Sequence, residues 1–141
     1  MKKIFVTRRE RFNAAHQMWN PKWDDATNKE VFGKCANKNW HGHNYQLFVT
    51  VKGTVNEDTG YCVDLKKVSQ IINRYVIEEL DHKNINLDVP FMQGKLASTE
   101  NLTLAIWEQL EEKIKTLGVQ LHSVRLHETE NNYVEYFGEQ K

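Results

Sequence analysis

The sequence is poor in cysteine and proline, and it has no long hydrophobic run. Only Cys35 and Cys62 are present, too few for a disulfide framework, so we expect two free thiols. The two prolines lie in polar or irregular stretches, and no linker or internal repeat divides the 141 residues. A single domain over residues 1–141 is therefore expected, with enough residues for a hydrophobic core.

Charge of one sign is also lacking, because 19 basic side chains balance 19 acidic ones. This balance excludes a global electrostatic field that would attract nucleic acid or an anionic membrane. No apolar run approaches the ~20 residues that span a bilayer, and Met1–Lys3 is not followed by the apolar stretch of a signal peptide. We therefore predict a cytoplasmic protein with no nucleic-acid or membrane partner.

The hydrophobic pattern predicts two pairs of strands. The first pair covers 4–16 and 43–55, where inward and outward side chains alternate, and a short hairpin strand follows over 61–63. The second pair covers 120–129 and 133–137, joined at an Asn-rich corner because asparagine tolerates a positive φ. The polar stretch 20–39 is predicted to be a long loop, and 81–96 to be irregular.

Two helices are predicted between the strand pairs. The first begins after the N-cap Asp64 and runs to about Leu80, with a buried stripe of Leu65, Val68, Ile72, Tyr75, Val76 and Leu80. Ser98 or Thr99 caps the second, whose stripe is Leu102, Ile106, Leu110, Ile114 and Leu117, and Gly118 ends it. The order β–β–α–α–β–β predicts the α+β class, with a four-stranded antiparallel sheet and both helices on one face. The open sheet edges favour self-association.

Three histidines are candidate metal ligands. His41 and His43 are two residues apart, so on a strand their side chains project from the same face, roughly 6.6 Å apart. His16 ends the strand expected to pair with theirs. Three imidazoles leave a fourth position open on a zinc ion, which is the catalytic rather than the structural pattern. Ordinary core or surface histidines remain the alternative on this evidence alone.

Cys35 is a candidate base or nucleophile. It lies just upstream of the histidines and between Lys34 and Lys38, whose positive charge would favour its thiolate. A free thiol without a role is the alternative reading. Cys62, next to apolar residues, is expected to be a packed small hydrophobic side chain.

Five motifs together resemble the 6-pyruvoyl-tetrahydropterin synthase family, over nearly the whole chain. They are Phe12–His16, Cys35 with five residues between it and His41–Tyr45, Leu80–Asn84, Ser98–Asn101 and His127–Asn132. The resemblance implies the tunnelling fold, in which three subunits join their sheets into a barrel and two trimers stack into a hexamer. The active sites of such a homo-oligomer lie at subunit interfaces.

The resemblance also assigns roles to single residues. His16, His41 and His43 match zinc ligands, Cys35 matches the proton-abstracting cysteine, and Asp81 with His82 matches the relay pair. The residues that match pterin-binding positions are Glu128, Thr99 and Glu100. Thr99 and Glu100 have a structural alternative as helix cap and first-turn acid.

The implied activity is that of a zinc-dependent lyase. It would convert 7,8-dihydroneopterin triphosphate to 6-pyruvoyl-tetrahydropterin with elimination of triphosphate. Within the family, 6-carboxy-5,6,7,8-tetrahydropterin synthase of the queuosine pathway is the alternative, which releases acetaldehyde and triphosphate. The five-residue spacing after Cys35 favours the pyruvoyl branch. A non-catalytic pterin- or zinc-binding module and a zinc hydrolase are rivals from other classes, although no H-E-x-x-H motif supports the hydrolase.

Overall fold

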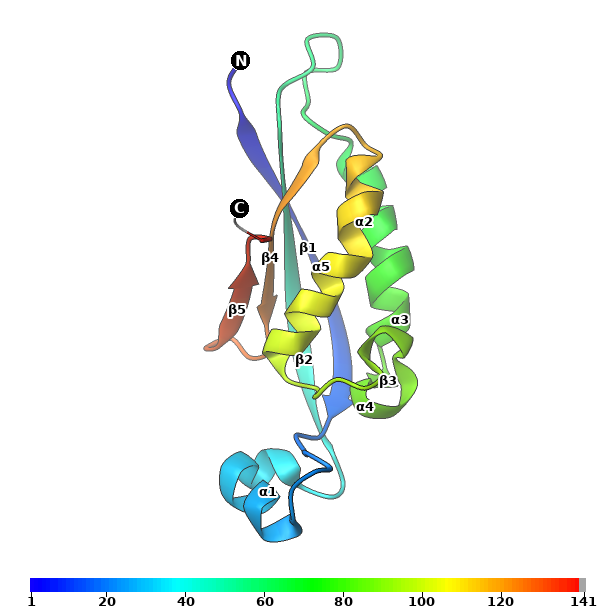
Figure 1. Cartoon of the computed structure of the whole chain (residues 1–141). Helices are drawn as coiled ribbons and strands as arrows, with labels where there is room; N and C mark the ends of the chain where they lie inside the picture. The colour runs from blue at the N-terminus through cyan, green and yellow to red at the C-terminus, as the bar shows by residue number, and fades with distance from the viewer. Residues whose placement is uncertain (140–141) are drawn as a thin grey trace.

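A five-stranded sheet in the order β3-β1-β2-β4-β5 forms the centre of the computed structural model, which describes residues 1–139 (Figure 1). The two longest strands, β1 (Ile4–His16) and β2 (His41–Gly53), pair antiparallel over their full length. β1 has the predicted bounds, and β2 begins and ends two residues earlier than predicted. The α+β class inferred from the pattern is confirmed.

The other strands extend this pair on both sides. β4 (Gln120–His127) pairs antiparallel with β2, and β5 (Tyr133–Tyr136) pairs with β4. The fifth strand, β3 (Lys83–Asn84), runs parallel to β1. The predicted four-stranded, wholly antiparallel sheet was therefore wrong in this detail, because two residues are too few to show an alternating pattern.

The corner between β4 and β5 is a hairpin, as predicted, but for another reason. In residues 1–139 the only residues other than glycine with positive φ are Trp40 and His82, so no asparagine of the corner adopts that conformation. Instead, the Thr129 hydroxyl accepts hydrogen bonds from the backbone N–H groups of Asn131 and Asn132, both at 3.2 Å. A side-chain turn of this kind replaces the positive-φ asparagine that was expected.

The first predicted helix is one continuous helical segment with a wider turn inside it. α2 (Leu65–Ile72) continues through a π-helical turn, Asn73–Ile77, into α3 (Glu78–Leu80). Asp64 caps it by accepting from the Lys66 N–H at 2.9 Å, as predicted. The π turn adds a residue, so Val76 and Ile77 are both buried. Two members of the predicted stripe differ, because Leu65 is exposed and Tyr75 is half-buried.

The second predicted helix, α5 (Thr99–Lys115), follows its predicted course. Its N-cap is Ser98, whose hydroxyl accepts from the Asn101 N–H, which decides between the two candidate caps. Gly118 has φ +79°, the left-handed conformation expected after a helix end. The predicted stripe is buried, except that Leu117 is only half-buried at the C-terminal end.

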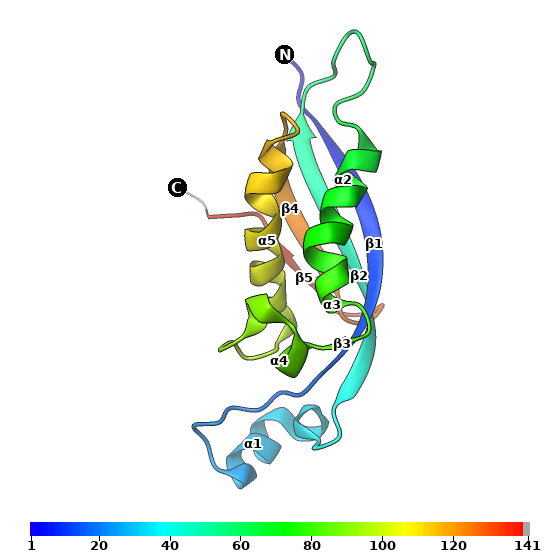
Figure 2. The ribbon, with the colours of Figure 1, turned by 90° about the vertical axis from the view of Figure 1, so that its right-hand side faces the viewer.

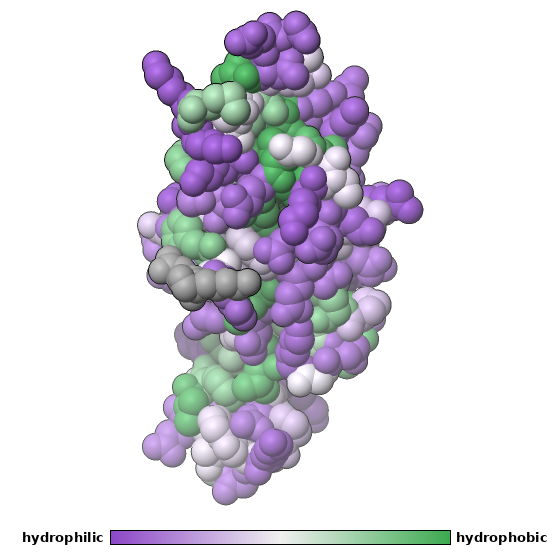
Figure 3. Space-filling model, turned by 45° about the horizontal axis from the view of Figure 1, so that its top comes forward, coloured by the Kyte–Doolittle hydropathy of each residue, from purple (hydrophilic) through white to green (hydrophobic). Residues whose placement is uncertain are grey.

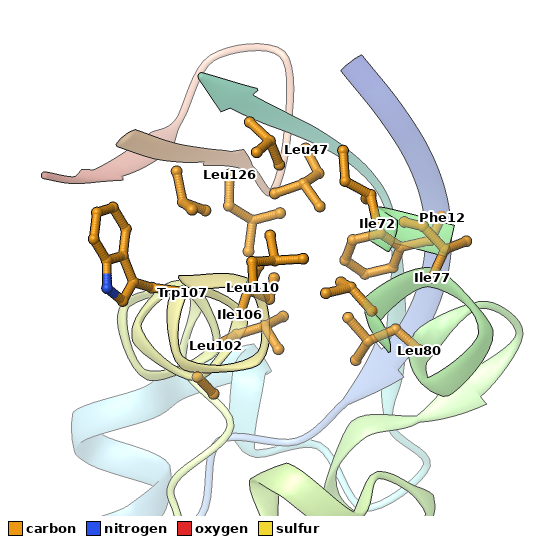
Figure 4. Close-up of a cluster of buried hydrophobic side chains, with 14 of the residues drawn as sticks. Phe12, Leu47, Ile72, Ile77, Leu80, Leu102, Ile106, Trp107, Leu110 and Leu126 are labelled. Carbon is orange, nitrogen blue, oxygen red and sulfur yellow. The ribbon is translucent and has the colours of Figure 1, made fainter. Parts of the chain in front are cut away.

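Both long helical segments cover the same face of the sheet, and the core lies between them and the strands (Figure 2). Leu47 and Leu126 point from the sheet toward Leu102, Ile106 and Leu110 of α5 (Figure 4). Phe12 faces the first helical segment, where the labelled side chains are Ile72, Ile77 and Leu80. Burial of these side chains is the main force that holds helices and sheet together.

The stretch predicted as a long loop contains a helix. α1 (Asp25–Phe32) is followed by a 3-10 turn, Gly33–Ala36. Both lie beyond the edge of the sheet where β1 ends and β2 begins (Figure 1). Asp24 caps α1 by accepting from the Thr27 N–H at 2.7 Å. The prediction failed because α1 has few apolar residues and thus no apolar stripe to reveal it. Its one buried residue is the polar Asn28.

Two further stretches differ from the prediction. Residues 61–63 form bends rather than a strand, because the Asn56–Gly60 turn directs the chain toward α2 instead of back along β2. The stretch predicted as irregular contains β3, the short helix α4 (Ile85–Asp88) and a 3-10 turn, Pro90–Met92.

Hydrophilic residues dominate the surface in Figure 3, and the hydrophobic areas between them are small and separate. Among residues 1–139, no helix combines the length and the apolar character that crossing a bilayer requires.

Candidate active site

The pairing of β1 with β2 brings the three histidines together. His16 lies directly opposite His41 in the ladder, and His43 follows on the same face of β2. The ring centroids are 4.4 Å apart for His16 and His41, 5.1 Å for His16 and His43, and 4.8 Å for His41 and His43. One nitrogen of each ring lies within 4.8 Å of those of the other two.

These imidazoles direct free nitrogens into the space between them. The Nδ1 of His16 lies 2.7 Å from the Ala97 carbonyl oxygen, and since a carbonyl only accepts, Nδ1 carries the proton. That leaves Nε2 of His16 with a lone pair. Nε2 of His16, Nδ1 of His41 and Nε2 of His43 are all buried without a hydrogen-bond partner. This donor set fits a zinc ion with an open fourth position.

Burial keeps the cluster uncharged. It lowers the pKa of His16, His41 and His43 below the ordinary histidine value, and the neighbouring imidazoles lower the pKa further. The negative charge of Glu128 opposes the shift in each case. Neutral imidazole is the form that binds a metal, so the cluster is already in its ligating state at pH 7.

Glu128 lies beside the cluster, at the end of β4. Its Oε1 is 3.6 Å from Nε2 of His43. Its Oε2 accepts a hydrogen bond from the Thr99 hydroxyl, at the first residue of α5. The structure therefore brings Thr99 and Glu128 together with the histidines. Glu100, one residue further along α5, is exposed and serves its helix as a first-turn acid.

Asp81 and His82 form a pair at the edge of β1. Nδ1 of His82 is 3.0 Å from Oδ2 of Asp81. The Asn13 backbone holds both residues, since its N–H donates to Oδ1 of Asp81 at 2.9 Å and its carbonyl accepts from the His82 N–H at 2.7 Å. The hydrogen bond from Asn13 lowers the pKa of Asp81. His82 has φ +60°, a strained conformation of the kind that gathers at functional sites.

The pair does not face the histidine cluster of the same chain. His82 lines a hollow with Asn13, Ala15, Gly42 and Asn44, and the hollow also takes in Ala14 and His43. Asn13, Ala15, Gly42 and Asn44 alternate along β1 and β2 with the three cluster histidines, so the hollow opens mainly on the opposite face of the sheet. His82 is also 77% exposed. One chain therefore holds its Asp81–His82 pair outside the histidine cluster, mainly toward the opposite face of the sheet.

Cys35 lies outside the cluster as well. It is exposed, within the 3-10 turn beyond the strand ends, and its carbonyl accepts from the Met18 N–H at 2.7 Å. The other thiol, Cys62, is half-buried and packs against the hydrophobic core, as expected. Its Sγ would lie 2.7 Å from a Cβ placed on Gly53.

Residues 5–139 match the family model described as 6-pyruvoyl tetrahydropterin synthase. The chain belongs to this family.

Three similar proteins illustrate the relationship. A Dictyostelium discoideum protein named 6-pyruvoyl tetrahydrobiopterin synthase is 42% identical over 136 residues, which cover 96% of this chain and 97% of that one. The solved structure of Caenorhabditis elegans 6-pyruvoyl tetrahydropterin synthase superimposes with a TM-score of 0.91 at 34% identity, covering 99% and 98% of the two chains. An Archaeoglobus fulgidus protein named putative 6-carboxy-5,6,7,8-tetrahydropterin synthase is 30% identical over 95 residues, 67% of this chain and 73% of that one.

As a member of the 6-pyruvoyl tetrahydropterin synthase family, the chain is an enzyme, a lyase of this family's type. The family resemblance is thus confirmed, and so is the fold of the single chain that it implies.

Two residues beside the cluster were missed as members of the site. The Tyr45 hydroxyl is buried without a hydrogen-bond partner, and burial together with Glu128 raises its pKa. Trp40 has φ +64° directly before His41. Tyr45 could have been found, because it continues the same-face series of His41 and His43 along β2. No sequence pattern marks a strained Trp.

The lowered histidine pKa values predict a pH dependence for the metal-free protein. As the pH falls through about 6.5, histidines of the unfolded chain take up protons while the buried cluster resists them. The free energy of unfolding of metal-free protein should therefore fall from pH 7.5 to pH 5.5, as measured by urea unfolding.

Two variants assign this slope to the cluster. His16→Asn can still donate to the Ala97 carbonyl, and it should reduce the slope. His122→Asn is the matched substitution outside the cluster, and it should retain the slope of the parent chain. An unchanged slope in His16→Asn would contradict the role given to burial.

Proposed function

We propose that the protein is a zinc-dependent lyase that converts 7,8-dihydroneopterin triphosphate to 6-pyruvoyl-tetrahydropterin with elimination of triphosphate. The observation that carries the proposal is the convergence of three buried, unpartnered imidazole nitrogens next to the Glu128 carboxylate. A cation site and an acceptor for a nitrogen-rich ring then lie side by side, which suits a pterin with a hydroxylated side chain.

His16, His41 and His43 would hold the zinc. When bound, zinc supplies Lewis-acid polarisation of the side-chain hydroxyls of the substrate. The hydrogen bond from His16 to the Ala97 carbonyl fixes the ring tautomer, so that Nε2 is available as the ligand.

Glu128 would anchor the pterin. A carboxylate can accept two hydrogen bonds from an amino-pyrimidine edge, with matching shape and charge. The Thr99 hydroxyl already holds one carboxylate oxygen and so sets its orientation. Glu100 is proposed as a further pterin contact, because its exposed side chain is free to reach a ligand.

Cys35 would act as the base that takes a carbon-bound proton from the substrate side chain. His82 would relay protons during the internal redox shift, which oxidises the side chain and reduces the dihydropterin ring. Asp81 would orient His82 and stabilise its protonated form. Triphosphate departs with the electron pair of its C–O bond, and the resulting enol becomes the methyl ketone of the pyruvoyl group.

We further propose that the active enzyme is a homo-oligomer, a hexamer built as a dimer of trimers. The separation of His82 from the histidine cluster supports this, because a neighbouring subunit can supply the relay pair that one chain holds on the other face. The sheet also ends in open edges at β3 and β5, which association between subunits would cover.

The identity of the product shows which of the two reactions the protein catalyses. Zinc-loaded protein is incubated with 7,8-dihydroneopterin triphosphate, and the pterin is identified by mass spectrometry while triphosphate and acetaldehyde are followed. We expect a 6-pyruvoyl product and triphosphate without acetaldehyde. A 6-carboxy product with acetaldehyde would assign the chain to the alternative branch. Pterin binding without triphosphate release would contradict the lyase.

The role of Cys35 makes a separate prediction. Cys35→Ala should keep the fold and the zinc but lower kcat at least about 100-fold, since general-base catalysis contributes about that much. Cys62→Ala is the matched control, because it removes the other thiol and should keep near-parental turnover. The measurements are steady-state kinetics, elemental analysis and circular dichroism. Parental turnover in Cys35→Ala would refute the proposed mechanism.

A further inference from the structure

The 3-10 turn that carries Cys35 has few attachments to the rest of the molecule. Apart from local hydrogen bonds within 29–37, two hydrogen bonds join Gly33–Ala36 to other parts of residues 1–139. One is the bond from the Met18 N–H to the Cys35 carbonyl, 2.7 Å long. The other is a 3.0 Å bond from Nε2 of Gln17 to the Ala36 carbonyl. The place of the thiol therefore depends on residues 17 and 18, directly after β1.

Gln17 is itself held in place by an amide side chain from a distant segment. The backbone N–H of Gln17 donates to Oδ1 of Asn86 at 2.9 Å, and Nδ2 of Asn86 donates to the Gln17 carbonyl at 2.9 Å. Asn86 thus occupies the place that a neighbouring strand would take, and it extends the pairing of β1 by one residue beyond His16.

Asn86 is itself held in place by contacts of its own segment. It lies in α4, and its backbone N–H donates to Oδ1 of Asn84 at 3.0 Å. Just before it, β3 pairs with Ala14 and Ala15 of β1. The segment 81–86 is therefore attached to β1 from Asn13 onward, and its last contact fixes Gln17.

We infer that Gln17 and Asn86 are positioning residues for Cys35: Asn86 fixes the Gln17 backbone, and Gln17 with Met18 fixes the turn that carries the thiol. The inference rests on the proposed role of Cys35 as the base. It also means that the segment bearing Asp81 and His82 and the turn bearing Cys35 share one rigid reference, the end of β1.

Loss of this positioning should affect turnover more than substrate binding. Misplacement of a reacting group by about 1 Å can cost about 100-fold in rate. The proposed zinc ligands, including His16 directly before Gln17, are held by the full-length pairing of β1 with β2, which the substitutions leave in place, and Glu128 lies after β4. Loosening the turn should therefore lower kcat and leave KM and zinc content near their parental values.

The test uses full-length, zinc-loaded protein and three variants. Gln17→Met removes the bond to Ala36 at similar side-chain size, and Asn86→Leu removes both bonds to Gln17. Asn86→Asp keeps an acceptor for the Gln17 N–H but cannot donate to its carbonyl. The matched control is Gln109→Met, because Nε2 of the half-buried Gln109 donates to the Ala105 carbonyl at 3.3 Å, within α5.

We expect Gln17→Met and Asn86→Leu to lower kcat about 10- to 100-fold with little change in KM. Asn86→Asp should fall between Asn86→Leu and the parent, and Gln109→Met should match the parent. Hydrogen exchange of the peptide that covers 33–37 should be faster than in the parent, and the variants with the largest loss of kcat should show the fastest exchange. Elemental analysis should show unchanged zinc.

Parental kcat and unchanged exchange in Gln17→Met and Asn86→Leu would overturn the inference. A fall in kcat accompanied by loss of zinc would overturn it too, because the defect would then lie at the metal site. Cys35→Ala distinguishes the proposed role of Cys35 as the base from the proposed positioning role of Gln17 and Asn86. If it retains turnover, the proposed base is wrong; if it is inactive while Gln17→Met is fully active, only the positioning role is wrong.

Discussion

The register of β1 against β2 is the constraint on which the rest of the structure depends. A slip of one residue would move His41 and His43 to the opposite face and separate them from His16. The same alternation buries Phe12, Tyr45 and the apolar residues that follow in β2. Hydrophobic burial therefore enforces the register, and the register aligns the imidazoles. The geometry of the histidine cluster follows from the core and needs no separate scaffold.

The site carries a cost that the core must offset. A buried polar group without a partner destabilises a protein by about 1–3 kcal/mol, and the cluster holds one such nitrogen on each of three rings. Trp40, directly before His41, and His82 add backbone strain at positive φ. Such features persist where function requires them. A bound cation would satisfy all three nitrogens at once.

Much of this architecture was predictable because the determining patterns are local. β1, the capped helices and the buried stripe of α5 follow from alternation, helical period and capping residues. The histidine cluster was predictable too, since it needs only the same alternation on two paired strands. The arrangement of His41 and His43 with Tyr45 belongs to that pattern, although Tyr45 was not recognised as part of the site.

Features that depend on single tertiary contacts were not predictable. α1 has no apolar stripe, and β3 is only two residues long. The position of His82 is set by the hydrogen bonds that the Asn13 backbone makes with His82 and with the side chain of Asp81, which no spacing reveals. The attachment of the Cys35 turn through Gln17 and Asn86 likewise joins residues about seventy positions apart.

X-ray absorption at the zinc edge of the purified, zinc-loaded protein would identify the ligands of the metal and so test whether the three histidines hold it. We expect three imidazole nitrogens at about 2.0–2.1 Å and one further oxygen or nitrogen. We also expect no sulfur ligand, so that Cys35 stays free to act as a base. A sulfur neighbour at about 2.3 Å, or fewer than three imidazoles, would contradict this ligand set.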